Sequence, residues 1–83
     1  MTIKFHPHAL ERIKERGTNK DEIISTIKGG EEFSAKFGRT GYRRNFPFES
    51  MWKGKRYNTK QVEVYIVKEN KDWIVVTVIV KYF

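Results

Sequence analysis

The chain has 83 residues, no cysteine and a formal net charge of +7, because 17 Lys and Arg side chains outnumber 10 Asp and Glu. A chain of this length can bury one modest core, so we expect a single domain over residues 1–83. Without cysteine, it has no disulfide scaffold, thiolate zinc site or cysteine nucleophile. The longest apolar run, Ile74–Val80, is too short to cross a bilayer, and the N-terminal residues lack the apolar stretch of a secretory signal. We therefore expect a cytoplasmic protein without a membrane partner.

The first residues predict a short strand followed by a short helix. Ile3 and Phe5 alternate with polar residues, which favours a strand. Pro7 suits the first position of a helix, because its fixed φ fits helix entry and its missing N–H would be unpaired there. An apolar stripe follows, and Gly17 can supply a left-handed cap. We expect the first helix to comprise His8–Arg16.

A second short helix is predicted at about residues 20–28. Asn19 and Glu22 have the spacing of a capping box, in which each side chain bonds the backbone N–H of the other residue. The apolar face of this helix is formed by Ile23, Ile24 and Ile27. The pair Gly29-Gly30 favours termination of the helix.

From Glu31 onward the apolar residues recur with a period of two, which predicts strands. We expect one strand with its apolar residues alternating over 33–37, a turn at Gly38–Gly41, and a second strand over 42–46 that ends at Pro47. Residues 48–58 look like a loop or an irregular hairpin with its tip at 53–55. A further strand contains Val62, Val64 and Ile66, and a turn follows at 69–72.

The last strand is predicted over Trp73–Tyr82 as the longest of the protein. Its two faces are both largely apolar, so we expect it to lie centrally, with helices on one side and another layer on the other. The faces are Ile74, Val76, Val78 and Val80 on one side, and Trp73, Val75, Thr77 and Ile79 on the other. The element order β-α-α-β-β-β-β predicts an α+β domain with two helices on one face of an antiparallel sheet.

The positive charge is concentrated in residues 34–60, which hold eight Lys and Arg residues, one acidic residue and six of the twelve aromatic residues. Cations neutralise phosphates and aromatic rings stack on bases, so this mixture favours binding of single-stranded nucleic acid. We expect the binding side chains to be Arg39, Arg43, Arg44, Lys53, Lys55 and Arg56. The alternative is a solvated hairpin whose aromatic residues belong to the core.

A second candidate surface lies on the predicted first helix. His8, Arg12 and Arg16 fall within about 80° of one another around a helix, so they form one ridge beside the apolar stripe. A bound phosphate would reverse the mutual repulsion of the two arginines. The first turn of a helix disfavours an imidazolium, and a neutral His8 suits a general base.

Two other interpretations of this segment remain open. Charged residues along one side of a helix usually face water, and His6 can simply cap the helix. The spacing of His6 and His8 also allows a metal site, but the chain has no third histidine, no cysteine and no paired carboxylates at ligand spacing. We therefore expect no metal ligand.

The motif Phe5-x-x-His8-Ala9-x-x-Arg12-Ile13-x-x-Arg16-Gly17, together with Val75-Val76-Thr77-Val78 near the end, resembles a small bacterial family of uncharacterised function, domain-of-unknown-function family 4258. That family is similar to the RelE/ParE and barnase-like toxins. The resemblance implies two N-terminal helices on an antiparallel sheet of about four strands. It also implies metal-independent RNA cleavage without a cofactor, with His8, Arg12, Arg16 and Thr77 at the site. Ile13 and Thr18 depart from the usual Met and Ile of the motif.

Cleavage of RNA without a metal requires a base for the ribose 2′-hydroxyl, cations for the phosphate and an acid for the leaving 5′ oxygen. His8 is the best candidate for the base, and Arg12 and Arg16 are the natural phosphate ligands. The sequence does not identify the acid; the candidates are His6, Tyr82, Arg43 and Arg44. Thr77 fits either a catalytic hydroxyl or a residue packed between strands.

Three functional hypotheses follow. The first is a toxin-like ribonuclease held inactive by an acidic antitoxin, with single-stranded RNA as its substrate. The second is a nucleic-acid-binding module without catalysis, in which the segment 36–60 binds and the helix ridge positions phosphates. The third is a basic protein-interaction domain that docks an acidic partner.

Overall fold

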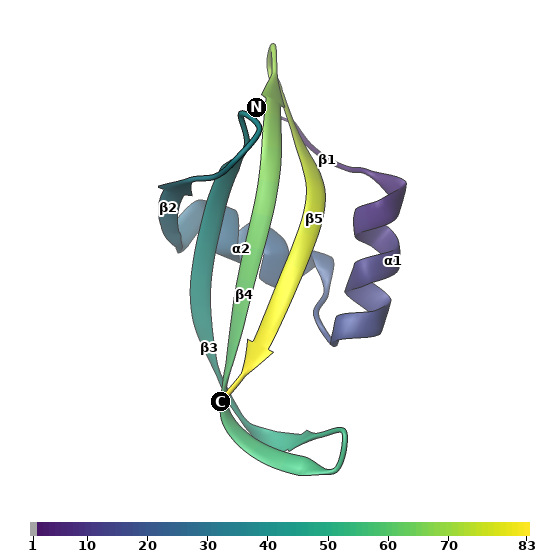
Figure 1. Ribbon diagram of the computed structural model, residues 1–83, viewed down its shortest axis with the longest axis vertical. Helices are drawn as coiled ribbons and strands as arrows, with labels where there is room; N and C mark the ends of the chain where they lie inside the picture. The colour runs from purple at the N-terminus through teal and green to yellow at the C-terminus, as the bar shows by residue number, and fades with distance from the viewer. Residues whose placement is uncertain (1) are drawn as a thin grey trace.

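The computed structural model describes residues 2–83, which form two helices and a five-stranded sheet in the predicted order (Figure 1). The elements are β1 (Thr2–Phe5), α1 (Pro7–Arg16), α2 (Lys20–Gly29), β2 (Glu31–Ser34), β3 (Thr40–Trp52), β4 (Lys55–Glu69) and β5 (Asp72–Tyr82). The domain is elongated, with extents of 42 × 24 × 22 Å. Neither helix in this part of the chain has the length and apolar character needed to cross a membrane.

The sheet is mixed rather than purely antiparallel. Its strand order is β1-β5-β4-β3-β2, and all neighbours are antiparallel except β1, which runs parallel to β5. The expectation of about four antiparallel strands is therefore wrong in one respect: the N-terminal strand joins the sheet as a fifth, parallel edge strand. A parallel pair needs a long crossover. Here the whole chain between β1 and β5 supplies it.

Both helices lie on one face of the sheet, as expected. The helix α1 packs against β5, and α2 packs against β4 and β3 (Figure 1). The core lies between the helices and the sheet and consists of Ala9, Ile23, Ile27, Tyr42, Val62, Val64, Ile66, Val75 and Val78. No helix or strand of residues 2–83 covers the opposite face, so the predicted second layer is absent there. We call this opposite face the helix-free face.

Local capping signals define both helices. The side chain of His6 accepts a hydrogen bond from the backbone N–H of His8, and Pro7 occupies the first turn. Gly17 ends α1 with φ of 74°, in the left-handed region that glycine tolerates best. Asn19 caps α2 by accepting from the N–H of Glu22 at 2.8 Å. These features confirm the predicted helix ends to within a residue.

The connection between β2 and β3 differs from the prediction. The strand expected over 33–37 ends at Ser34, and the turn lies at 36–39 rather than at 38–41. Phe37 and Gly38 have φ of 62° and 68°, which removes Phe37 from any strand. Alternating apolar residues therefore extended the predicted strand three residues too far.

The strand β3 continues past Pro47, where we expected it to end. Only Thr40–Arg43 of β3 pair with β2, so at Pro47 one edge of the strand is unpaired and the missing N–H leaves no gap in the sheet. A register shift between Pro47 and Ser50 bends the strand into a long hairpin with β4. This extension makes β4, with 15 residues, longer than β5, with 11.

A bulge in β5 changes which side chains share a face. Val75 pairs with Ile66, whereas Thr77 pairs with the preceding residue, Tyr65, so Val76 is the extra residue. Val75 and Val78 consequently both lie in the core beneath the helices. The strict two-residue alternation predicted for this strand is wrong, because the bulge shifts its phase.

The buried ammonium of Lys60 fastens the junction of the two helices to β4. Its Nζ donates to the carbonyl oxygen of Gly17 at 3.1 Å and lies 2.9 Å from Oε1 of Glu22. The same Glu22 oxygen accepts from the hydroxyl of Thr18. Lys60 is 8% exposed, so its charge is compensated by these partners rather than by water.

We expect Lys60→Ala to lower the free energy of unfolding by about 2–4 kcal/mol, because it leaves the Glu22 carboxylate without its cation and the Gly17 carbonyl without its donor. Lys55→Ala, on the exposed part of the same strand, should change it by less than about 0.5 kcal/mol. Urea unfolding of both variants measures the difference. Equal stabilities would contradict a structural role for Lys60.

The stability should also fall at alkaline pH. Burial raises the pKa of Tyr42 far above its ordinary value of 10.0, and the hydrogen bond that its hydroxyl donates to Glu32 raises it further. The unfolded chain loses this proton near pH 10 while the folded chain keeps it, so stability is complete below that pH and declines above it. Each such tyrosine contributes a slope of up to about 1.4 kcal/mol per pH unit. Urea unfolding at pH 9 and pH 11 should show a smaller decline for Tyr42→Phe than for the unaltered protein.

Candidate nucleic-acid interface

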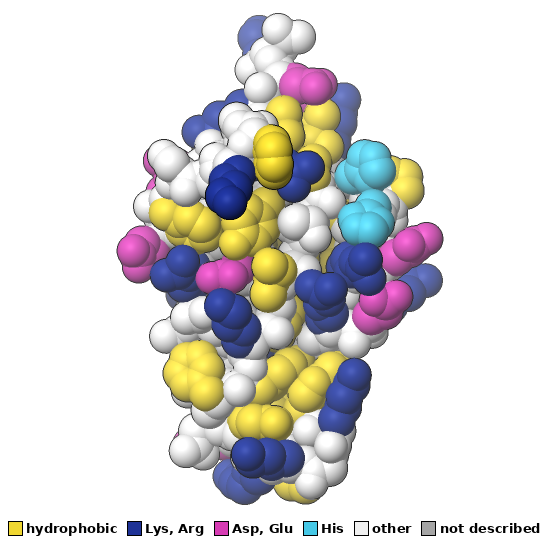
Figure 2. Space-filling model, viewed as in Figure 1, with side chains coloured by type: hydrophobic (Ala, Val, Ile, Leu, Met, Phe, Trp, Pro, Cys, Tyr) yellow, Lys and Arg dark blue, Asp and Glu magenta, His cyan; other side chains and the backbone are white. Residues whose placement is uncertain are grey.

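The ridge predicted on α1 borders the helix-free face of the sheet. In Figure 2, which views this face, both histidines of the chain and the Lys and Arg side chains below them lie along one margin of the molecule. α1 packs against β5, so the ridge is adjacent to the last strand. His8 is exposed.

The two arginines of the ridge differ in how they are held. Nη1 of Arg12 lies 3.0 Å from Oε2 of Glu15, one turn along the helix. Nη1 of Arg16 donates to the carbonyl oxygen of Val78 at 2.8 Å, and its side chain is half-buried. Arg16 therefore attaches α1 to β5, whereas Arg12 makes an ordinary surface ion pair.

Thr77 lies on β5, the strand that α1 flanks. It pairs with Tyr65 and is half-buried. Residues paired across antiparallel strands share a face, and the bulge turns Thr77 away from the core residues Val75 and Val78. The hydroxyl is thus on the helix-free face.

A small hollow joins the end of the ridge to the hairpin formed by β3 and β4. It has a volume of about 190 Å³ and is lined by Glu15, Arg16, Trp52, Lys53, Val80 and Tyr82. The hairpin comes this close because Trp52 stacks on Tyr82 at 4.9 Å between ring centroids, and the hydroxyl of Tyr82 donates to the Arg16 carbonyl. A Cβ on Gly17 would lie 2.7 Å from the Trp52 ring, so only glycine fits there. Two cations, Arg16 and Lys53, thus line one hollow together with Glu15 and two half-buried rings.

The predicted nucleic-acid-binding residues do not form one surface. Nε of Arg43 lies 2.9 Å from Glu63, and Arg44 donates to the hydroxyl and carbonyl oxygens of Ser25 on α2. Adjacent residues of a strand point to opposite faces, so these two arginines are separated by the sheet. Five exposed cations of residues 34–60 form two groups near opposite ends of the long axis: Lys36 and Arg39 in the β2–β3 turn, and Lys53, Lys55 and Arg56 at the hairpin tip (Figure 1).

Most aromatic side chains of the basic segment serve the fold. Tyr42 is in the core and stacks on Trp73. The rings of Phe48, Trp52 and Tyr57 surround Tyr82. Phe37 differs from them, because its side chain is 87% exposed.

Glu63 is a residue of the helix-free face that the sequence patterns did not single out. It is 4% exposed, and its carboxylate lies 2.9 Å from Arg43 and 3.7 Å from Lys81. The hydroxyl of Tyr65 lies 3.5 Å from Oε1 of Glu63. Burial and, second to it, the negative charge of Glu63 raise the pKa of Tyr65. The place of Glu63 between Val62 and Val64 is a signal that it faces away from the core, but its burial depends on side chains from two other strands.

The structure also narrows the candidates for a general acid. The hydroxyl of Tyr82 is engaged with Arg16, and burial raises the pKa of Tyr82. Arg44 is engaged with α2. Arg43 is paired with the buried carboxylate of Glu63. His6, one of the two histidines at the margin of the helix-free face, is the remaining candidate (Figure 2). Within residues 2–83, no three His, Cys, Asp or Glu side chains lie close enough together to hold a metal ion.

The two arginines of the ridge should differ in their effect on stability. Arg16→Ala removes a charged hydrogen bond to the edge of β5 and should lower the free energy of unfolding by about 1.5–3 kcal/mol. Arg12→Ala removes an exposed i,i+3 ion pair and should change it by about 0.5 kcal/mol or less. Thermal and urea unfolding check both values. A stability loss for Arg12→Ala that matches that of Arg16→Ala would contradict this assignment.

Comparison with known proteins identifies a family. The model of a family described as a domain of unknown function, DUF4258, matches residues 5–80. No curated protein and no solved structure was found to match the chain. The matched segment runs from the last residue of β1 into β5 and includes the ridge, the β2–β3 turn, the β3–β4 hairpin and Thr77. The protein therefore belongs to the DUF4258 family.

Proposed function

We propose that this protein is a toxin-like ribonuclease of the RelE/ParE and barnase-like type, which cleaves single-stranded RNA at the margin between α1 and the sheet without a metal ion. The observation that carries the proposal is the junction at Arg16, which lines one hollow with Lys53 of the hairpin while sharing its helix face with His8 and Arg12. A phosphodiester in this region would meet cations from two separate elements. The one-sided arrangement of two helices on a sheet, which leaves a broad face open to a polymer, also supports it.

The proposed chemistry is attack of the ribose 2′-hydroxyl on the adjacent phosphorus. His8 takes the proton of the 2′-hydroxyl, the new P–O bond forms a cyclic phosphate, and the bond to the 5′ oxygen breaks. Arg12 and Arg16 bind the phosphate oxygens as their negative charge increases. The leaving oxygen takes a proton from a nearby acid, for which His6 is the candidate. The hydroxyl of Thr77 orients the phosphate from β5.

The charge of the protein suggests how such an activity would be controlled. A net charge of +7 favours association with an acidic protein as well as with RNA. We therefore include an acidic antitoxin in the proposal, as a partner that covers the cations of the helix-free side. A neighbouring open reading frame with a strongly acidic product is the genomic feature that this part of the proposal requires.

The test is cleavage of a single-stranded RNA in the presence of a chelator. We expect products with cyclic phosphate ends, and we expect His8→Ala to lower the rate by about 10²–10⁴-fold, which is the usual contribution of a general base. The exposed position of His8 means that this variant should unfold at the same urea concentration as the unaltered protein. Lys14→Ala, on the opposite side of α1, is the matched control and should cleave normally.

A second function is favoured by the engagement of Arg16 with Val78 and of Arg12 with Glu15, because both arginines already have protein partners. In that case the protein binds RNA without cleaving it. His8→Ala would then leave every measured property unchanged. If RNA binding weakens as salt is added and no product with a cyclic phosphate forms, the ribonuclease function is rejected and the RNA-binding function stands.

A further inference from the structure

The turn between β2 and β3 holds an aromatic ring out into solvent at a conformational cost. The N–H of Arg39 donates to the carbonyl oxygen of Lys36, and the two residues between them have positive φ, 62° at Phe37 and 68° at Gly38. Turns with positive φ at both central residues favour Asn-Gly, and a bulky residue in the first position is disfavoured. Phe37 gains little packing in return, because it is 87% exposed. Unfavourable backbone geometry that burial does not offset is typical of binding sites.

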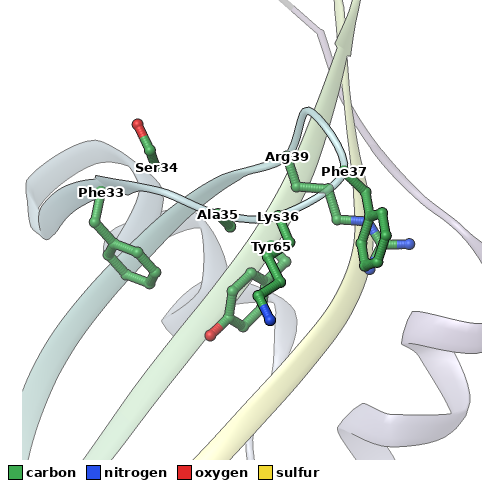
Figure 3. Close-up of a pocket in the computed structure, with 7 residues that line it drawn as sticks. All are labelled: Phe33, Ser34, Ala35, Lys36, Phe37, Arg39 and Tyr65. Atoms are coloured by element: carbon green, nitrogen blue, oxygen red, sulfur yellow. The ribbon is translucent and has the colours of Figure 1, made fainter.

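This turn overhangs a hollow on the helix-free face. The hollow has a volume of about 380 Å³, within the range of small-ligand sites. Figure 3 shows the rings of Phe33, Tyr65 and Phe37 around it, with Lys36 beside Tyr65 and Arg39 beside Phe37. Phe33 and Tyr65 contact each other edge to face across Gly41, where a Cβ would lie 2.3 Å from the Phe33 ring. The two inner rings are therefore held by the sheet, and the turn presents the exposed ring of Phe37 as the third wall.

The cations at this hollow differ from those nearer the middle of the sheet. Arg43, Arg44 and Lys60 have protein partners. Among residues 2–83, by contrast, Lys36 and Arg39 have no ion-pair partner. Two exposed cations beside an exposed aromatic ring are a combination that suits single-stranded nucleic acid, in which a base stacks on a ring and the flanking phosphates meet the cations.

We propose that this hollow binds an unpaired base of single-stranded RNA, stacked on Phe37, with its flanking phosphates on Lys36 and Arg39. The inference rests on the proposed function and extends it, because Tyr65 at the floor of the hollow is paired with Thr77 of the proposed cleavage site. An RNA strand lying across β4 would thus reach both places. The hollow serves affinity and base preference, whereas the ridge serves cleavage.

The test uses Phe37→Asn, which separates the stability of the turn from its binding. Asn tolerates the positive φ better than Phe, so this variant should raise Tm by about 4 °C while weakening the binding of a fluorescently labelled, single-stranded oligoribonucleotide by about tenfold. Phe83→Asn is the matched control, because it removes another exposed ring and should leave the affinity unchanged. An oligonucleotide of the same length and charge but with abasic sites should bind the unaltered protein and Phe37→Asn with equal affinity.

The outcomes distinguish this inference from the proposed function. If Phe37→Asn binds RNA as tightly as the unaltered protein, the base site is rejected, and cleavage that depends on His8 is unaffected. If binding depends on Phe37 but no cleavage occurs, the base site stands and the enzyme is rejected. Absence of any RNA binding, or equal weakening by Phe83→Asn, overturns the base site; selective binding of an acidic peptide in place of RNA would do so as well.

Discussion

The buried ammonium of Lys60 is the interaction on which the arrangement of this small domain depends. It joins the turn between the helices, through the Gly17 carbonyl and Glu22, to the strand that lies at the centre of the sheet. Trp52 and Tyr82 close over the same turn. Because these contacts hold the helix junction against the hairpin, the last residue of α1 comes to lie beside the hairpin tip. A domain of this size has a small apolar core, so one buried and well-compensated charge contributes much to the choice of a single fold.

A consequence is that the two faces of the sheet have different tasks. The helix-covered face contains the apolar core and uses Arg44 and Lys60 as structural cations. The helix-free face contains the buried carboxylate of Glu63, which holds Arg43 and lies near Lys81 at the centre of the sheet. The high net charge is thus not one uniform patch. Several cations have protein partners, and two groups of exposed cations lie near opposite ends of the long axis, where we propose that a polyanion binds.

At the β2–β3 turn, the binding role that we propose for Phe37 comes at the expense of stability. An Asn-Gly turn would suit the backbone better than Phe-Gly does, and the ring of Phe37 gains almost no burial. Residues of this kind are expected where a site is maintained at the expense of stability. At the hairpin tip, by contrast, the aromatic rings add to stability, because Trp52 and Tyr57 pack around Tyr82.

The sequence by itself determined the element order, the helix ends and the side of α1 on which His8, Arg12 and Arg16 lie, because caps, turns and periodicity are local properties. It placed the Phe37 turn two residues too far along and ended β3 too early at Pro47, since strand ends depend on which neighbour is paired. Only the tertiary structure decided that β1 runs parallel to β5, that a bulge at Val76 reverses the faces of β5, and that Arg16 bonds Val78. These features join residues far apart in the chain, and no local pattern records the partner that each side chain meets after folding.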